Sequence, residues 1–411
     1  MGTSTLAMIL AGGVGKRLFP LTRDRVKPAV PFGGIYRLVD FVLSNCLNSQ
    51  IRRICVLTQY KSLSLERHLR YGWSFLPYTL GEFVQILPPQ QRVDSSWYSG
   101  TADAVYQNIY SIEQTRPDTV LILAGDHIYK MNYRLMIEAH VASGAAVTVG
   151  AVPVPLQRAR EFGVMGVDRN GRITRFTEKP RHPDPMPGKP DTALASMGIY
   201  VFDTGLLEQS LRNDHQDPTS SHDFGRDLLP RLIREVPVHA YLFVDENRKQ
   251  ELYWRDVGTI DAYWEASMDL VAVDPVFNLY DSDWPIRTYT EAAPPAKFVF
   301  ADLQCRTRMG RAGLAMDSLV CNGDILAGGQ VIRSILSPRV RVEEEARVEE
   351  SILFEGVTVG AGCRLRRVIV DKEVAIPAGT RIGLDRKADR RRFTVSDGGI
   401  TVVSRRYHFA G

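Results

Sequence analysis

Short apolar runs alternate with helix-like segments through residues 1–275. Continuous apolar runs at residues 6–10, 54–58 and 120–124 are typical of strands buried on both faces of a sheet. Between these runs, apolar residues at a spacing of three or four predict amphipathic helices at residues 39–47 and 104–112. This alternation predicts an α/β fold in which helices cover both faces of a largely parallel sheet.

A hairpin interrupts the helical rhythm. The runs 164–168 and 173–176 flank Asn170-Gly171, a dipeptide that tolerates positive φ at both centres of a type I′ turn. Antiparallel strands are therefore expected beside the parallel ones, and the predicted sheet is mixed.

The composition changes near residue 276. Pro275, Pro285, Pro294 and Pro295 fall within a short stretch that has no clear periodicity, which is typical of a boundary between domains. A chain of 411 residues also exceeds the size at which a single core stops growing. We expect a first domain at 1–275, a linker at 276–300 and a second domain at 301–411.

The second domain carries a repeat. Apolar residues recur every 17 positions in four series: Ile325, Val342, Val359 and Ile376; Val331, Val348, Leu365 and Ile382; Ile335, Ile352 and Ile369; and Val340, Val357 and Val374. The first two series lie six residues apart, which is the spacing of a triangular parallel β-helix with three short strands per coil. An irregular β domain with coincidental spacing is the alternative, and four aligned series argue against it.

Charge and cysteine content narrow the class of protein. The net charge is +4, and the arginine clusters are short and mixed with acids, so a solvated surface or a small-anion site is favoured over nucleic-acid binding. The five cysteines are widely spaced and include no C-x-x-C pair, which fits a reducing compartment. No apolar run reaches 18 residues, and no basic leader precedes the first strand. We expect a cytoplasmic protein with neither membrane nor nucleic-acid partners.

A glycine-rich loop follows the first predicted strand. Gly12, Gly13 and Gly15 let backbone amides approach an oxyanion, and a helix after the loop would add its dipole. The loop matches neither the P-loop pattern nor the dinucleotide fingerprint, and taken alone it is equally consistent with a structural turn. Arg17 and Lys27 follow closely, and such cations beside amides suit a polyphosphate.

Two aspartates are candidate metal ligands. Asp126 comes directly after the run 120–124, where parallel strands present their carboxyl ends. Asp256 lies much further along the chain, and the residues alone do not show that the two meet. An aspartate after a strand also commonly caps a helix or forms a turn, and we interpret the neighbouring His127 as structural.

The glycine loop belongs to a recognisable motif. The stretch 10–18, L-A-G-G-V-G-K-R-L, followed by Lys27-Pro28, resembles the signature of sugar-1-phosphate nucleotidyltransferases. Phe32-Gly33-Gly34, Asp40-Phe41, the stretch 43–46 (L-S-N-C) and Thr58-Gln59-Tyr60 narrow the resemblance to bacterial glucose-1-phosphate adenylyltransferases, and it covers nearly the whole chain. It implies a Rossmann-like, GT-A-like sheet, mixed and mostly parallel, followed by a left-handed parallel β-helix of the hexapeptide-repeat kind.

The resemblance also implies a reaction. AMP passes from ATP to α-D-glucose 1-phosphate by Mg²⁺-assisted in-line displacement, giving pyrophosphate and ADP-glucose for glycogen (α-glucan) synthesis. The implied catalytic residues are Arg17, Lys27, Asp126 and Lys179, and the implied Mg²⁺ ligands are Asp126 and Asp256. The implied ATP site holds Leu10, Gly12, Gly13, Gly15, Gln91 and Gly100. The implied glucose 1-phosphate site holds Tyr98, Gly163, Glu178, Lys179 and Ser196.

Assembly and regulation follow from the resemblance only in outline. It implies a homotetramer controlled by small anionic allosteric effectors, for which Arg25 and Arg37 are candidate ligands. Asp24 and Pro31 depart from the basic residues of many fructose-bisphosphate-activated relatives, so the effector stays open.

Three rival functions share some of these features. A related transferase for UTP, GTP or N-acetylglucosamine 1-phosphate would share the glycine loop. An acyltransferase would need a histidine on the β-helix coils, and residues 310–382 contain none. A non-catalytic regulatory subunit is disfavoured because the catalytic positions named above are all intact.

Overall fold

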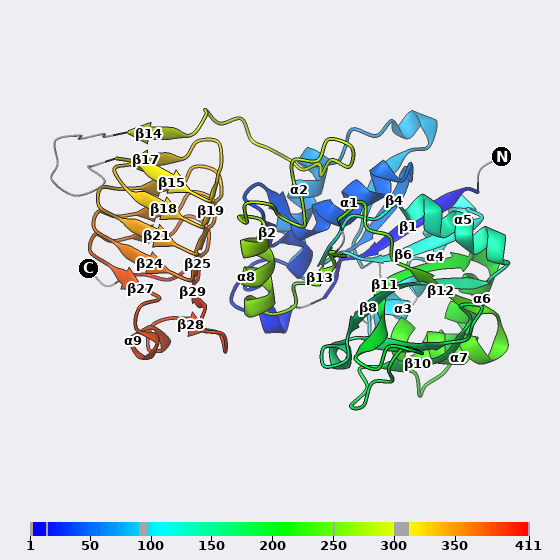
Figure 1. The fold of residues 1–411 in the computed structure, drawn as a ribbon. Helices are drawn as coiled ribbons and strands as arrows, with labels where there is room; N and C mark the ends of the chain where they lie inside the picture. Colours follow the sequence, from blue (N-terminus) through cyan, green and yellow to red (C-terminus); the bar gives the residue numbers. More distant parts are fainter. Residues whose placement is uncertain (1–2, 14, 90–96, 250, 300–311, 410–411) are drawn as a thin grey trace.

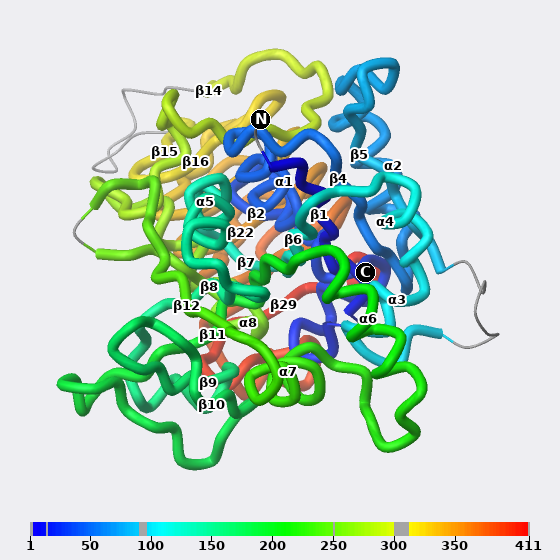
Figure 2. The backbone as a smooth tube through the Cα atoms, turned by 90° about the vertical axis from the view of Figure 1, so that its right-hand side faces the viewer, coloured from blue at the N-terminus to red at the C-terminus, as the bar shows by residue number. Residues whose placement is uncertain are grey.

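The protein consists of an α/β domain and a β-helix. The computed structural model describes residues 3–13, 15–89, 97–249, 251–299 and 312–409. Helix α8 (Ile260–Asp269) stands between the two bodies (Figure 1). A view turned by 90° places the coils of the β-helix behind the α/β domain, so the two bodies lie end to end (Figure 2).

A nine-stranded mixed sheet forms the centre of the α/β domain. Its order is β10-β9-β11-β6-β1-β4-β5, with β8 pairing β11 and β12 pairing β8. The strands are β1 (Thr5–Leu10), β4 (Arg53–Leu57), β5 (Phe83–Leu87), β6 (Thr119–Ala124), β8 (Val147–Pro155), β9 (Gly163–Val167), β10 (Ile173–Glu178), β11 (Thr192–Asp203) and β12 (Val238–Leu242). Strands β6, β1, β4 and β5 are parallel, whereas β11 is antiparallel to β6, β8 and β9. The predicted mixed sheet is confirmed.

Helices cover both faces of this sheet. They are α1 (Leu38–Asn48), α2 (Leu63–Gly72), α3 (Thr101–Tyr106), α4 (Ile109–Thr115), α5 (Tyr133–Ser143), α6 (Thr204–His215) and α7 (Leu229–Glu235), with a π-helix η5 (Phe224–Leu228) and the 3-10 helices η1 (Lys16–Leu18), η2 (Lys27–Ala29), η3 (Tyr78–Leu80) and η4 (Ala159–Glu161). Alternate residues of β1 enter opposite cores: Ala7 packs with Val39 of α1, and Met8 packs with Val105 of α3. The helix predicted at 104–112 is divided into α3 and α4.

The predicted hairpin forms, but its turn differs from the expected type. Strands β9 and β10 pair antiparallel, and only Gly171 of the two turn residues has a positive φ (78°). The Asp168 carboxylate accepts hydrogen bonds from Asn170 N (2.8 Å) and Arg172 N (3.0 Å). This side-chain cap organises a longer loop than the two-residue type I′ turn, which would place both central residues at positive φ.

Three parallel sheets build the β-helix. The first holds β14 (Lys297–Val299), β17 (Ile325–Ala327), β20 (Arg341–Val342), β23 (Thr358–Val359) and β26 (Ala375–Ile376); the second holds β15 (Leu314–Met316), β18 (Gln330–Ile332), β21 (Arg347–Glu349), β24 (Arg364–Arg366) and β27 (Arg381–Ile382); the third holds β16 (Leu319–Val320), β19 (Ile335–Leu336), β22 (Ile352–Leu353), β25 (Val368–Val370), β29 (Thr401–Val403) and the antiparallel β28 (Thr394–Val395). Helix α9 (Arg386–Arg390) follows β27.

The 17-residue repeat gives the register of these coils, with one correction. Val331, Val348, Leu365 and Ile382 pair in succession across the second sheet, as their spacing predicts. Ile325 is wrongly assigned, because it pairs with Arg341 and it is Leu326 that lies opposite Val342. The corner between β17 and β18 is one residue shorter than the corresponding corners between β20 and β21 and between β23 and β24. Leu326 is therefore the residue buried in the stack.

The segment between the two bodies packs against the α/β domain. The described residues between α8 and β14 form no helix or strand, yet Phe277 is fully buried. The ammonium of Lys130, also fully buried, donates to Asn278 O (2.8 Å) and lies 2.9 Å from Asp281. The last residues of the stretch expected as a linker, β14, already pair with β17 of the β-helix.

Apolar and polar contacts join the β-helix to the α/β domain. One buried cluster combines side chains such as Phe41 and Tyr263 with Ile335 and Ile352 of the coils. On α8, Trp264 Nε1 donates to Glu350 O (2.8 Å). The junction is therefore a continuous core, and α8, which starts just after Asp256, is part of it.

Candidate active site

Two aspartates distant in sequence meet at the carboxyl end of β6. Asp126 comes directly after that strand, and Gly125 N donates to Leu10 O (3.1 Å) at the end of β1. Asp256 lies on β13 (Arg255–Asp256), which pairs antiparallel with β7 (His127–Ile128) and sets Asp256 opposite His127. This short ladder brings both predicted metal ligands to the edge of the sheet at which open α/β folds bind ligands.

Lys27 lies between the two carboxylates. Its ammonium is 2.8 Å from Asp126 Oδ2 and 2.9 Å from Asp256 Oδ1, and the residue is 8% exposed. Burial alone would lower the pKa of Lys27, but the two carboxylates outweigh it and raise the pKa above the ordinary value. Burial likewise opposes ionisation of Asp126, and the Lys27 charge reverses this and lowers the pKa of Asp126 to about 2. Both groups are therefore charged at neutral pH.

The carboxylate pair fits a divalent cation. Asp126, His127 and Asp256 each offer a ligand atom within 4.8 Å of the others, and Mg²⁺ prefers carboxylate oxygens. His127 Nδ1 is buried without a hydrogen-bond partner in the described part of the chain, and its ring meets that of Trp254 edge-on at 5.2 Å. The residues present can thus hold Mg²⁺ through the two aspartates.

The glycine loop connects β1 to η1. Gly15 has φ +63°, and Thr22 Oγ1 donates to its carbonyl (2.9 Å), which fixes the turn in a conformation that favours glycine. The 3-10 helix η1 after the loop has only three residues. The helix dipole expected from the sequence therefore does not apply here, because it needs a longer run of aligned peptides.

A cavity of about 270 Å³ lies beside the glycine loop. It is lined by Leu10, Gly13, Gly15, Lys16, Arg17, Lys27, Pro28, Asp126 and Gly258. Arg17 Nη2 lies 3.0 Å from the position that a Cβ on Gly258 would take, two residues after Asp256. The structure thus gathers glycine-loop residues, three cationic residues and the Asp126 carboxylate around one space large enough for phosphate groups.

The Glu178 carboxylate lies between two glycines, Gly163 and Gly225. Glu178 ends β10 and pairs with Gly163 of β9, and a Cβ on Gly163 would lie 2.9 Å from Glu178 Oε2. A Cβ on Gly225 would lie 2.8 Å from the same oxygen. Burial outweighs the charge of Lys179 and raises the pKa of Glu178. A carboxylate in this setting is suited to accepting hydrogen bonds from hydroxyl groups.

The other predicted sugar-site residues lie on neighbouring elements. Lys179 has a left-handed backbone (φ +47°), and its half-exposed ammonium is 3.5 Å from Glu178 Oε1. Ser196, on β11, accepts a hydrogen bond from Gly198 N (3.3 Å), and β11 pairs with β9 beside Gly163. Tyr98 Oη accepts one from Asn108 Nδ2 (2.9 Å).

Two predicted ATP-site residues have different outcomes. The Gly100 Cα faces backbone, since a Cβ there would lie 2.1 Å from His222 O. This close approach accounts for the glycine and leaves its expected contact with adenine a prediction. Gln91 lies outside the described residues. Gly12, by contrast, packs on Gln59, whose Nε2 donates to Tyr98 O (3.2 Å), so the glycine loop and the segment around Tyr98 are in contact.

Residues 223–225 also lie against the Glu178 carboxylate, and the sequence did not predict this. Asp223 caps the π-helix η5 by accepting hydrogen bonds from Gly225 N (2.9 Å) and Arg226 N (3.1 Å). The following Phe224 stacks on Tyr200 with 5.6 Å between ring centres. An aspartate before a helix is the ordinary sequence pattern of a cap, so nothing in the residue order singles out this segment as part of a site.

The two candidate effector ligands occupy different surroundings. Arg25 is 4% exposed, and its guanidinium pairs with Asp371 of the β-helix at 2.8 Å. Arg37 donates to Ser64 Oγ (2.7 Å), and burial lowers its pKa. Of the two, only Arg37 lines the cavity of about 920 Å³ at the domain junction, which Arg339 and Lys372 also line, each paired with Glu355. An anion could reach Arg25 only by displacing Asp371.

No helix in the described ranges is long and apolar enough to cross a membrane.

Comparison with known proteins agrees with this fold and site. A family model described as nucleotidyl transferase matches residues 6–272, and one described as GlmU-like, C-terminal hexapeptide matches residues 294–403. The α/β domain with its glycine loop and paired aspartates therefore belongs to a nucleotidyltransferase. The hexapeptide match fits the left-handed β-helix expected from the sequence.

Full-length relatives define the family more narrowly. Proteins named glucose-1-phosphate adenylyltransferase from Koribacter versatilis (strain Ellin345) and Rhodopirellula baltica are each 54% identical to this chain over 98% of its length, covering 96% and 91% of the relatives. One of the same name from Hydrogenovibrio crunogenus is 54% identical over 97% of this chain and 93% of its own. The chain belongs to the glucose-1-phosphate adenylyltransferase family.

Proposed function

We propose that the protein transfers AMP from ATP to α-D-glucose 1-phosphate, releasing pyrophosphate and forming ADP-glucose for glycogen (α-glucan) synthesis. The observation that carries the proposal is the pair Asp126 and Asp256 around Lys27, at the mouth of a cavity lined by glycine-loop residues. Membership of the family supports the choice of nucleotide and sugar phosphate.

The residues of this chain position the substrates and neutralise the charge of the phosphate groups. Gly12, Gly13 and Gly15 hold the nucleotide phosphates, and Arg17 and Lys27 neutralise the departing pyrophosphate. Asp126 and Asp256 would hold Mg²⁺, which when bound would supply positive charge to the phosphate oxygens. No covalent intermediate on the protein is needed, because one phosphate oxygen displaces pyrophosphate at the α-phosphorus in a single step.

The sugar phosphate binds beside the Glu178 carboxylate. Glu178 accepts hydrogen bonds from glucose hydroxyls, and Lys179 aligns the attacking phosphate. The remaining residues assigned to this site are Tyr98, Gly163 and Ser196. Leu10, Gln91 and Gly100 complete the assigned nucleotide site.

Regulation, assembly and location complete the proposal. Small anionic effectors act at the domain junction with Arg37 as a ligand, and Arg25 takes part if its pair with Asp371 opens. The enzyme is a cytoplasmic homotetramer with a catalytic domain at 1–275, a linker at 276–300 and a β-helix at 301–411. Sedimentation of the purified enzyme, and its activity with phosphorylated metabolites or adenine nucleotides, test these points.

Substrate competition tests the proposed reaction. Initial rates are measured with ATP, UTP or GTP, each with glucose 1-phosphate or N-acetylglucosamine 1-phosphate. ATP with glucose 1-phosphate should be the fastest pair. A faster rate with UTP, GTP or the N-acetylated sugar would assign the protein to another specificity.

A further inference from the structure

The loop between α6 and η5 contains a residue in an uncommon backbone conformation. His222 has φ +54°, in the left-handed region that few residues other than glycine adopt, although histidine, asparagine and aspartate are enriched there. Such a conformation persists where the surrounding structure fixes it, and it is often found at functional sites. The contacts of His222 show what fixes it.

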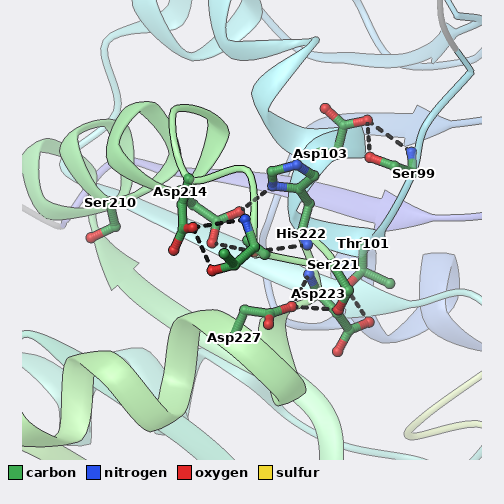
Figure 3. A network of polar contacts seen from close by, with 12 residues as sticks. Ser99, Thr101, Asp103, Ser210, Asp214, Ser221, His222, Asp223 and Asp227 are labelled. Atoms are coloured by element: carbon green, nitrogen blue, oxygen red, sulfur yellow. Dashed lines mark hydrogen bonds and ion pairs between the residues drawn. The ribbon is translucent and has the colours of Figure 1, made fainter.

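A buried aspartate anchors the His222 side chain. Asp214, at the end of α6, is 2% exposed, and its Oδ2 lies 2.8 Å from His222 Nδ1, which donates to it. Ser220 Oγ donates to Asp214 Oδ1 (2.9 Å) and accepts a hydrogen bond from His222 N (2.9 Å). Figure 3 shows Asp214, Ser221 and His222 within this network. Side chain and backbone of His222 are thus held by one carboxylate.

The fixed backbone turns the His222 carbonyl toward the start of α3. His222 O accepts hydrogen bonds from Ala102 N (2.8 Å) and Asp103 N (3.3 Å). The same oxygen would collide with any side chain at Gly100, where a Cβ would be 2.1 Å away. The segment that carries Tyr98 and Gly100 is therefore seated directly on His222.

Residues 223–225, which follow His222, contact Thr101 and the Glu178 carboxylate. Thr101 Oγ1 donates to Asp223 Oδ2 (3.0 Å) and accepts a hydrogen bond from Phe224 N (3.0 Å). Gly225 then backs onto the Glu178 carboxylate, because a Cβ on this glycine would lie only 2.8 Å from Glu178 Oε2. Residues 222–225 thus contact both the start of α3 and the Glu178 carboxylate.

We infer that the Asp214–His222 pair is a positioning unit. It sets the distance between the Tyr98–Gly100 segment and the Glu178 carboxylate. Neither residue is placed at the reacting atoms, so their effect passes through Thr101, Gly225 and the backbone of α3. The inference rests on the proposed assignment of Tyr98, Gly100 and Glu178 to the two substrates.

Substitutions at His222 distinguish the effect of its hydrogen bond to Asp214 from the effect of side-chain packing. His222→Ala removes the donor to Asp214, whereas His222→Asn keeps an N–H donor on a residue that tolerates positive φ. His222→Gly keeps the backbone freedom and removes the donor. His408→Ala is the matched control, because His408 is exposed on the β-helix.

The experiment measures kcat and KM for both substrates, and the unfolding midpoint, on the full-length enzyme. His222→Ala and His222→Gly should raise both KM values about tenfold with kcat changed less than about threefold, since losing binding that the ground state and the transition state share raises KM and leaves kcat unchanged. His222→Asn should stay within about threefold of wild type, and His408→Ala should be unchanged. Asp214→Asn should resemble His222→Ala.

Other results overturn the inference. Wild-type KM values in His222→Ala, or equal impairment in His222→Asn, would show that the anchor does not position the sites. A lower kcat and midpoint with unchanged KM would show a structural role alone. The KM of each variant is compared with the wild-type KM for the nucleotide and sugar phosphate that the wild-type enzyme uses. If the proposed reaction is wrong, this is seen separately, because no ADP-glucose is formed.

Discussion

Asp256 stands opposite His127 in an antiparallel ladder only two residues long, and this pairing brings it beside Asp126. Lys27 then closes the group by contacting both carboxylates at 2.8 and 2.9 Å. The arrangement concentrates two negative charges and one positive charge at the end of the sheet where nucleotide phosphates would enter.

Asp256→Asn should lower kcat about 10²- to 10³-fold, the range seen when one preorganised electrostatic group is removed from an active site. The fold should persist, because the amide keeps the size of the side chain. Pyrophosphate release and circular dichroism measure the two effects. Asp274→Asn, at a side chain 82% exposed, is the control and should behave as wild type. Full activity in Asp256→Asn would contradict the assigned role.

The ionisation of Asp126 gives a pH prediction. Its pKa, about 2, lies below the ordinary 3.8 because of Lys27. A depressed carboxyl pKa stabilises the folded state above pH 3.8, and this stabilisation is lost as the pH falls from 3.8 toward 2. Lys27→Met should move the titration of Asp126 to higher pH, since the largest of the effects that oppose burial is then removed. Carboxyl-carbon NMR titration of wild type and variant measures this, and an unchanged titration would contradict the contact.

Much of this architecture could be predicted from the sequence, because it depends on local periodicity. The buried run 120–124 and the 17-residue series each report which side chains face the core. The meeting of Asp126 and Asp256 could not be derived this way, since a two-residue ladder leaves no periodic pattern. Only the resemblance to a family supplied it.

Other misses have equally physical reasons. Ile325 is assigned one residue away from the buried position because the corner between β17 and β18 is one residue shorter than the later ones, whereas Val342, Val359 and Ile376 pair as predicted. The role of Arg25 in the junction depends on Asp371, which lies in the other body of the protein. Residue types near each position gave no indication of either, because both depend on packing between distant segments.

Gly163→Ala should raise the KM for glucose 1-phosphate at least about tenfold. A Cβ there would lie 2.4 Å from Phe176 Cζ and 2.9 Å from Glu178 Oε2, so the ring and the carboxylate must both move. Gly166→Ala on the same strand is the matched control, because its nearest neighbours would be 3.6 Å away. Steady-state kinetics distinguish them. Equal KM values in the two variants would show that Glu178 is not needed where it now lies.

The buried pair Arg25–Asp371 gives a stability prediction. Both side chains are 4% exposed, and removing one partner of a buried ion pair costs about 3–5 kcal/mol. Arg25→Met should therefore lower the free energy of unfolding by that amount, and Arg25→Met/Asp371→Leu should recover most of it. Arg406→Met removes an exposed pair with Asp24 and should cost less than about 1 kcal/mol. Urea unfolding measures all three, and equal losses in the two single variants would contradict a buried role.

The proposed reaction moves the AMP group of ATP, with its α-phosphorus, to glucose 1-phosphate. Incubating the enzyme with Mg²⁺, glucose 1-phosphate and ATP labelled separately at the α- and γ-phosphates tests it most directly. The α label should appear in ADP-glucose and the γ label in pyrophosphate. Recovery of the γ label in a sugar product, or no transfer of the α label to sugar, would contradict it.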